Sequence, residues 1–320
     1  MGTLRNFMFH DVRDLKDTKY PKRYGLRSFL QWDDFKERIR IISNRYKVIS
    51  SEVAIRLDLN QINGDYATLT FDDGLADHYE VYKYLKSLDL CATFLVPRKP
   101  VLERKMFKTH KIQFLLASVD EKELVEEILS MFDTDGEEFS IRNFIWHRYS
   151  HSPWKDNWWS KEMVFITNFL RNYNTDMYDN YFDIGKYIDI GKYIDKLFRK
   201  YVPQSEKEVA EDLYLTERQL RIMSKQACVI IGGHGDSSEN LKTPHYDYKK
   251  DIKKSCEFVR KYSTDLYFSY PNGGYTENIK KALNDEGCKL AYTIEKKTIT
   301  DLDDIDYLEF PRYDGSQVRL

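Results

Sequence analysis

The sequence contains few cysteines. There are four in 320 residues: Cys91, Cys228, Cys256 and Cys288. No pair has C-x-x-C spacing, which argues against a zinc finger, and nothing in their separation demands a disulfide. Cys91 and Cys228 lie in apolar runs, so we predict that both are small, buried hydrophobic side chains.

Long apolar runs are also lacking. A membrane-spanning helix needs about 18 or more consecutive apolar residues, and no such run occurs. We therefore expect no transmembrane segment. Residues 1–9 lack the apolar core of a signal peptide, which predicts a cytoplasmic protein.

Charge of one sign is not in excess, because the formal net charge is −2. A broad basic surface is therefore not indicated, and we expect no nucleic-acid partner. The content of hydrophobic residues, 42%, predicts a globular protein with a sizeable core. Aromatic residues reach 15%; such side chains can stack on sugar rings, although the core is their more common place.

Strand and helix patterns alternate in two parts of the chain. This alternation in residues 1–97 and 214–320 predicts a parallel sheet or barrel with helices outside it. Residues 98–213 are charged, aromatic and helical in pattern, and we interpret them as an insertion. A tandem hexapeptide at 183–188 and 189–194 is too short for a solenoid and predicts a duplication within one helix.

One stretch carries the most chemistry. Residues 66–71 form an apolar, β-branched run that ends in Asp72, Asp73 and Gly74. Ligands bind at the carboxyl ends of strands in α/β sheets. Of two carboxylates at such an end, one can bind a metal while the other acts as a base. The alternative is a simple turn in which an aspartate caps the next helix.

Two further predicted strands also end in polar residues. Residues 228–233 lead into His234, and residues 266–271 lead into Asn272 and Gly273. If all these strands are parallel, their ends meet at one edge of the sheet, which favours a site over a turn.

With these three strand ends, the chain resembles the polysaccharide deacetylase family, the NodB-like enzymes of carbohydrate esterase family 4. Residues 70–74 match the first motif of that family, residues 231–234 resemble the start of the second, and residues 268–275 resemble the third. The resemblance covers residues 5–97 and 214–313. It implies an α/β fold, a distorted, incomplete (β/α) barrel of the NodB type.

The resemblance also implies roles for individual residues. Asp73 and His234 would bind a divalent metal, Zn, Mn, Co or Ni. Asp72 would be the general base that activates water. Tyr270, Asn272 and Gly273 would bind substrate, with a backbone N–H near Asn272 helping to stabilise the oxyanion.

The sequence departs from the family pattern at several positions. Ser238 stands where the second motif has another histidine, so the third metal ligand has to come from elsewhere, and we predict His245, with His10 as another candidate. Ser269 replaces an arginine of the third motif. No histidine follows His245, so the late histidine that serves as general acid is missing, and we assign a catalytic role to His10. Arg312 is predicted to contact an anionic substrate, although structural roles are the more common outcome for such residues.

The resulting hypothesis is metal-dependent hydrolysis of an N-acyl group, acetyl or formyl, from an amino sugar. A nucleotide-linked or lipid-linked precursor of a surface glycan would suit a cytoplasmic enzyme. The alternative is a catalytically degenerate protein that binds a glycan without hydrolysing it, which Ser238 and the missing late histidine favour. The sequence leaves the oligomeric state open.

Overall fold

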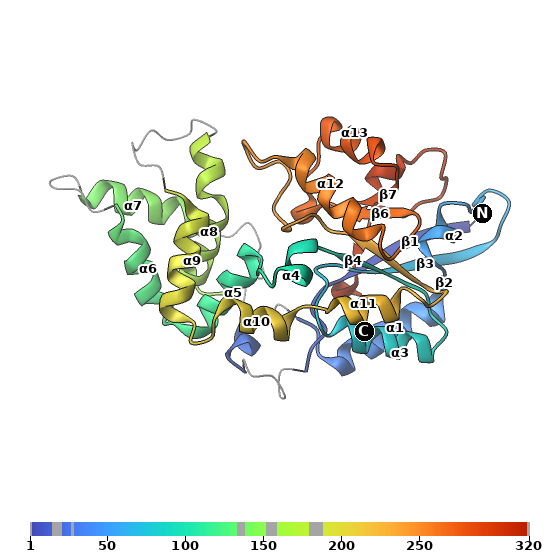
Figure 1. Cartoon of the computed structure of the whole chain (residues 1–320), viewed down its shortest axis with the longest axis horizontal. Coiled ribbons are helices and arrows are strands. Elements are labelled where there is room, and N and C mark those ends of the chain that lie inside the picture. Colours follow the sequence, from blue (N-terminus) through green and yellow to red (C-terminus); the bar gives the residue numbers. More distant parts are fainter. Residues whose placement is uncertain are drawn as a thin grey trace. The chain divides into compact units, whose positions relative to one another are not determined.

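The computed structural model describes residues 2–14, 21–26, 29–132, 138–151, 159–178 and 188–318. These residues belong to two compact units (Figure 1). Unit 1 comprises Met1–Asp14, Phe29–Lys105 and Lys207–Leu320, and unit 2 comprises Leu15–Ser28 and Met106–Glu206. The division predicted from the sequence, at 97/98 and 213/214, stays a prediction.

Unit 1 is built on a parallel sheet with the strand order β7-β6-β5-β4-β3-β1-β8, and β2 pairs with β3 as well. The predicted fold class, an incomplete (β/α) barrel, is confirmed. The strands are β1 (Gly2–Phe9), β2 (Lys47–Val48), β3 (Gly64–Phe71), β4 (Ala92–Val96), β5 (Val229–Gly233), β6 (Leu266–Ser269), β7 (Cys288–Tyr292) and β8 (Tyr313–Asp314).

Helices follow most of these strands and cover their apolar side chains. α12 packs against β5 and α13 against β7. The two helices also pack against each other (Figure 1). The α-helices that lie wholly in unit 1 are α1 (Trp32–Arg45), α2 (Ser51–Ala54), α3 (His78–Ser87), α4 (Arg98–Leu102), α11 (Glu217–Met223), α12 (Tyr248–Val259) and α13 (Glu277–Asp285). α11 begins at a well-formed N-cap, because Thr216 forms a full capping box with Gln219.

The secondary-structure elements in the described residues of unit 2 are helices. α10 (Glu206–Leu213) begins at Glu206, the last residue of unit 2, and its other residues belong to unit 1. Inside the unit, the buried Lys111 ammonium is 2.5 Å from Asp195 and 3.0 Å from Glu206, so its charge is compensated. The other elements are the 3₁₀-helix η1 (Pro21–Leu26) and α5 (Lys108–Ser118), α6 (Glu121–Ser130), α7 (Glu138–Tyr149), α8 (Lys161–Tyr178) and α9 (Ile190–Tyr201). None of the described helices is long and apolar enough to cross a membrane.

Two local predictions were wrong. The composition of residues 307–312 predicts a last strand, but this run forms the 3₁₀-helix η3 (Tyr307–Glu309) and only an isolated bridge between Phe310 and Tyr292. The second hexapeptide does not continue a helix from the first, because Asp189 is the N-cap of α9 and accepts from the Lys192 N–H. Residues 183–187 of the first copy lie outside the described residues.

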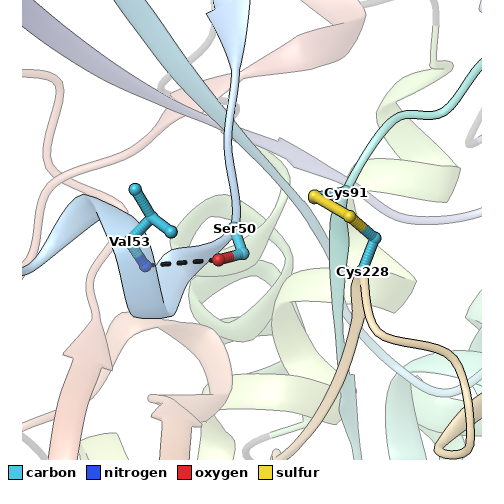
Figure 2. Close-up of a disulfide and its surroundings, with 4 residues drawn as sticks. All are labelled: Ser50, Val53, Cys91 and Cys228. Carbon is cyan, nitrogen blue, oxygen red and sulfur yellow. Dashed lines mark hydrogen bonds between the residues drawn. A yellow bond between two sulfur atoms is a disulfide. The ribbon is translucent and has the colours of Figure 1, made fainter.

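The prediction that Cys91 and Cys228 are buried and unpaired was also wrong. The two residues form a disulfide (Figure 2); Cys91 is half-buried and Cys228 is exposed. They immediately precede β4 and β5, where Ala92 pairs with Val229 and the Ala92 N–H donates to the Cys228 carbonyl. The register of two adjacent strands therefore brings together cysteines that are 137 residues apart. The other two cysteines are free and buried.

Candidate active site

The functional residues predicted from the sequence follow the carboxyl ends of neighbouring parallel strands. β3 ends before Asp72, β5 before His234 and β6 before Tyr270. The backbone is left-handed at Asp73, with φ 75°, and at Asn272, with φ 53°. Such conformations are uncommon outside glycine and cluster at functional sites, because surrounding structure has to hold them in place.

The turn after β3 is fixed by close packing. The Asp72 N–H donates to the Phe9 carbonyl at 3.0 Å, which continues the pairing of β3 with β1. Gly74 has φ 59°, and a Cβ added to it would lie 2.8 Å from a methyl group of Val96. Only glycine fits this position without a shift of β4, so the two carboxylates enter the site on a well-defined turn.

Asp72 is buried and ionised. The guanidinium of Arg312 donates to both of its carboxylate oxygens, at 2.8 and 2.9 Å. The Ser269 hydroxyl is 3.3 Å from Asp72 Oδ2. Burial alone would raise the pKa of Asp72, but the charges of Arg312 and His234 outweigh burial and hold this pKa below its usual value. A carboxylate in this state can accept a proton.

The predicted substrate contact of Arg312 stays a prediction, but the bonds of its side chain favour another role. Its side chain is fully buried, and besides binding Asp72 it donates to Thr70 Oγ1 at 3.1 Å and to the Thr293 carbonyl at 2.9 Å. With these bonds the guanidinium is occupied inside the sheet. Arg312 orients Asp72 and compensates its charge.

His234 lies between the two aspartates. Its Nε2 is 3.4 Å from Asp73 Oδ1, and its Nδ1 is 2.6 Å from the Ser269 hydroxyl and 3.1 Å from the Ser269 carbonyl. A chain of polar contacts therefore runs from Asp73 through His234 and Ser269 to Asp72. Burial lowers the pKa of His234, but the bond to Asp73 and the charges of both aspartates outweigh burial and raise it.

Two of the four predicted substrate-binding residues are accessible. Asn272 is exposed and Gly273 half-buried. Tyr270 is 1% exposed, because its ring stacks on Tyr275 at 4.9 Å and its hydroxyl donates to the Leu308 carbonyl at 2.8 Å. The Tyr270 side chain is therefore enclosed and supports the turn at Asn272, while its contact with substrate stays a prediction.

His10 follows β1 directly, and its side chain is exposed. It is close enough to Asp72 to be among the charges that lower the pKa of that carboxyl, after Arg312 and His234. Phe9 pairs with Phe71, so His10 and Asp72 follow two adjacent strands at the same edge of the sheet; their roles as acid and base stay predictions.

Comparison with solved structures gives consistent matches. The chain is similar to the deacetylase PplD of Streptococcus pyogenes, solved in complex with acetate, with 14% identity and a TM-score of 0.54 over 98% of this chain and 92% of that one. It is similar to IcaB from Ammonifex degensii, with 12% identity and a TM-score of 0.54 over 98% and 91%. The chain has the polysaccharide deacetylase fold.

A polysaccharide deacetylase from Bacillus cereus shares this fold, with 12% identity and a TM-score of 0.53. This chain aligns over 98% of its own length but spans only 64% of the Bacillus protein. No protein-family model and no curated protein sequence matches the chain. The similarity is therefore one of fold, and function has to be argued from the residues.

The metal implied by the deacetylase resemblance is only partly accommodated. Asp73 and His234 are suitable donors, since Ser269 holds the Nδ1 side of the imidazole and leaves Nε2 toward Asp73. Catalytic zinc sites take three protein ligands. Over the part of the chain that the structure describes, no three His, Cys, Asp or Glu side chains are grouped to hold a metal. His245 is exposed and is not grouped with this pair. The residues as placed therefore do not fit a three-ligand site, and the role of His245 as a ligand stays a prediction.

Sequence reasoning missed the roles of Arg312 and Ser269. Ser269 had been noted only because it replaces an arginine of the third motif. The structure supplies an arginine to Asp72 from the residue that immediately precedes β8, 240 residues away in sequence. Arg312 itself is the signal that could have indicated this pairing. It is an arginine elsewhere in the chain, in a sequence that lacks the arginine of the third motif.

A buried carboxylate, Asp11, and a half-buried one, Asp77, share one arginine near His10. Arg13 Nε is 2.7 Å from Asp77 Oδ2 and 3.4 Å from Asp11 Oδ1. Burial, together with the charge of Asp11, raises the pKa of Asp77 to about 7 although Arg13 opposes the shift. A raised pKa in the folded state contributes stability that is complete below the unfolded pKa and is lost as the pH rises through the folded pKa.

Asp77→Asn should therefore change how stability depends on pH. The amide mimics the protonated carboxyl, so the variant should gain free energy of unfolding over the parent as the pH rises from about 4 to about 7. Urea unfolding at pH 5 and pH 8 measures the gain, with the exposed Asp304→Asn as the matched control. If the free energies of unfolding of the variant and the parent differ by the same amount at both pH values, the raised pKa of Asp77 is contradicted.

Proposed function

We propose that this chain hydrolyses the N-acyl amide, acetyl or formyl, of an amino sugar. The observation that carries the proposal is the carboxylate of Asp72, held ionised by Arg312 on the edge of a deacetylase fold. His10, His234 and Asp73 lie around it. This set supplies a base, an acid and polar groups within one site.

In the proposed reaction, Asp72 accepts a proton from the attacking water, and the water oxygen bonds to the amide carbonyl carbon. His10 gives a proton to the departing amine as the C–N bond breaks. The products are a free amino sugar and acetate or formate. Backbone N–H groups around Asn272 are the proposed donors to the oxyanion.

The substrate class is tested with a panel. Purified full-length chain is incubated with N-acetyl and N-formyl amino sugars that are free, nucleotide-linked, lipid-linked or oligomeric. Each is tried without added metal and with Mn, Co, Ni or Zn, and released acetate or formate is measured. Asp72→Asn should lower the rate by about 10²–10⁴-fold, the usual contribution of a general base.

Release by the parent and not by Asp72→Asn supports the proposal. No release from any member of the panel, or equal release by both proteins, contradicts it. His234→Gln is a second control, because it alters the Asp73–His234 pair and leaves the bonds between Asp72 and Arg312 in place.

A second candidate function is glycan binding without hydrolysis. The specific observation in its favour is the incomplete donor set at Asp73 and His234. Calorimetry with the same sugars separates the two functions: binding without product from any sugar, under every metal condition, supports the binding protein.

A further inference from the structure

His78 is a buried polar residue beside the site that the reaction above does not use. It is the first residue of α3 and is fully buried. Its ring lies 5.6 Å from that of Phe71 and 5.8 Å from that of Phe94, measured between centroids. Burial lowers the pKa of His78 to about 4, so the imidazole is neutral near pH 7 and carries a single N–H.

The partner of that N–H is the backbone of His10. His78 Nε2 is 2.9 Å from the His10 carbonyl oxygen. A carbonyl only accepts hydrogen bonds, so Nε2 carries the proton and donates. Nδ1, the other ring nitrogen, has no hydrogen-bond partner in the described residues, so this single bond accounts for the polar contacts of the imidazole.

The backbone around His10 is held on both sides. The Phe9 carbonyl accepts from the Asp72 N–H at 3.0 Å, and the Asp11 carbonyl accepts from the Leu30 N–H at 2.8 Å. Arg13 adds a second link to the start of α3 through Asp77. The His10 ring is exposed and forms no hydrogen bond with any described residue, so its direction depends on its backbone.

We propose that His78 is a positioning residue for His10: its Nε2–H bond to the His10 carbonyl fixes the direction in which the His10 imidazole leaves the end of β1, beside Asp72. The chain that follows Asp72 leads directly into α3, which begins at His78. The bond from His78 therefore links the backbone of His10, the proposed acid, to the segment that carries Asp72, the proposed base. Catalytic groups need this kind of support to be held in a productive geometry. The inference rests on the proposed function for its catalytic consequence and on geometry alone for the positioning.

The test compares two variants of His78. His78→Phe keeps a flat ring but has no donor, and His78→Gln places an amide N–H near the position of Nε2. With a substrate found in the panel, His78→Phe should lower kcat by 10–100-fold with little change in KM, and His78→Gln should stay within about threefold of the parent. Equal losses in both variants, or none in His78→Phe, would overturn the proposal.

A double variant separates positioning from general damage. If His78 acts through His10, adding His78→Phe to His10→Ala should lower kcat no further than His10→Ala alone. An additional loss of tenfold or more would overturn the proposal. Thermal unfolding checks that each protein is folded. If His78→Phe does not fold, His78→Asn replaces it, because its shorter amide is polar but stops short of the Nε2 position.

A spectroscopic readout makes the result independent of catalysis. In protein labelled with ¹³C,¹⁵N-histidine, the His10 ring resonances, assigned with His10→Ala, should shift or broaden in His78→Phe and return in His78→Gln. Unchanged His10 resonances in His78→Phe would overturn the positioning role even in an active enzyme. Perturbed resonances in a chain that releases no acyl group would uphold the positioning role and count only against the proposed function.

Discussion

Replacing Arg312 with methionine is expected to destabilise the protein by about 3–5 kcal/mol, the usual cost of leaving a buried charge without its partner. Asp72 is 2% exposed and receives two of its hydrogen bonds from this guanidinium. The Thr293 carbonyl and the Thr70 hydroxyl would also lose a donor. Urea unfolding at neutral pH measures the loss, and Arg312→Lys, which keeps the charge without the two-pronged contact, should lose less.

The loss from Arg312→Met should depend on pH. In the parent, the pKa of Asp72 is held below its unfolded value, so the carboxylate contributes stability above that value which is lost as the pH falls through the folded pKa. Without Arg312, burial dominates and raises the pKa of Asp72. The variant should therefore be closest to the parent in acid and furthest from it above pH 7.

A double-mutant cycle identifies the pair as the cause. Adding Asp72→Asn to Arg312→Met should recover part of the lost stability, because the unpaired charge is then removed. A loss below about 1 kcal/mol for Arg312→Met, or purely additive losses in the cycle, would mean that the two residues are not energetically coupled.

Reducing the Cys91–Cys228 disulfide is the second change for which a large effect is expected. The bond closes a segment with a sequence separation of 137 residues. The chain-entropy model gives a stabilisation of about 5 kcal/mol for a loop of this length, because the unfolded chain is constrained. Unfolding with and without a reductant measures the effect, and a Cys91→Ser, Cys228→Ser double variant should not respond to the reductant.

Thiol titration of the denatured protein checks that the disulfide forms. Two thiols, those of Cys256 and Cys288, should react before reduction and four afterwards. Four reactive thiols without reductant would contradict the pairing, and so would a stability that the reductant leaves unchanged. The result also bears on the location of the protein. Persistent disulfides are typical of oxidising compartments and rare in the cytosol, whereas the lack of a signal peptide predicts a cytoplasmic protein.

The sequence patterns that succeeded were local ones. The apolar runs before Asp72 and before His234 each lie within a short window of sequence and indicate where a strand ends. Parallel pairing then brings such strand ends to one edge of the sheet. The pairing of Arg312 with Asp72 could not be found in this way, because Arg312 immediately precedes β8 and does not follow the carboxyl end of a strand. The fold alone brings those residues together.

Burial depends on the whole fold, so a local pattern does not predict it. Tyr270 is predicted to bind substrate from its place in the third motif, but Tyr275 and Leu308 enclose its side chain. Residues 307–312 have a strand-like composition, yet Asp306 caps a 3₁₀ turn there by accepting from the Leu308 N–H. His245 was chosen as the third metal ligand because it lies near the second motif in sequence, and nearness in sequence carries no information about distance in the fold.

The helical unit is discontinuous in sequence, which has a consequence for cloning. Leu15–Ser28 belongs with Met106–Glu206. The Arg23 guanidinium lies 5.1 Å from the ring centroid of Phe114, and the Trp159 indole donates to the Leu26 carbonyl at 3.2 Å. A gene fragment that encodes 106–206 alone would omit these partners. A chimera that exchanges this unit with that of a relative would have to replace two coding segments. A single deletion between β4 and β5 would leave residues 15–28 in the chain without the rest of their unit.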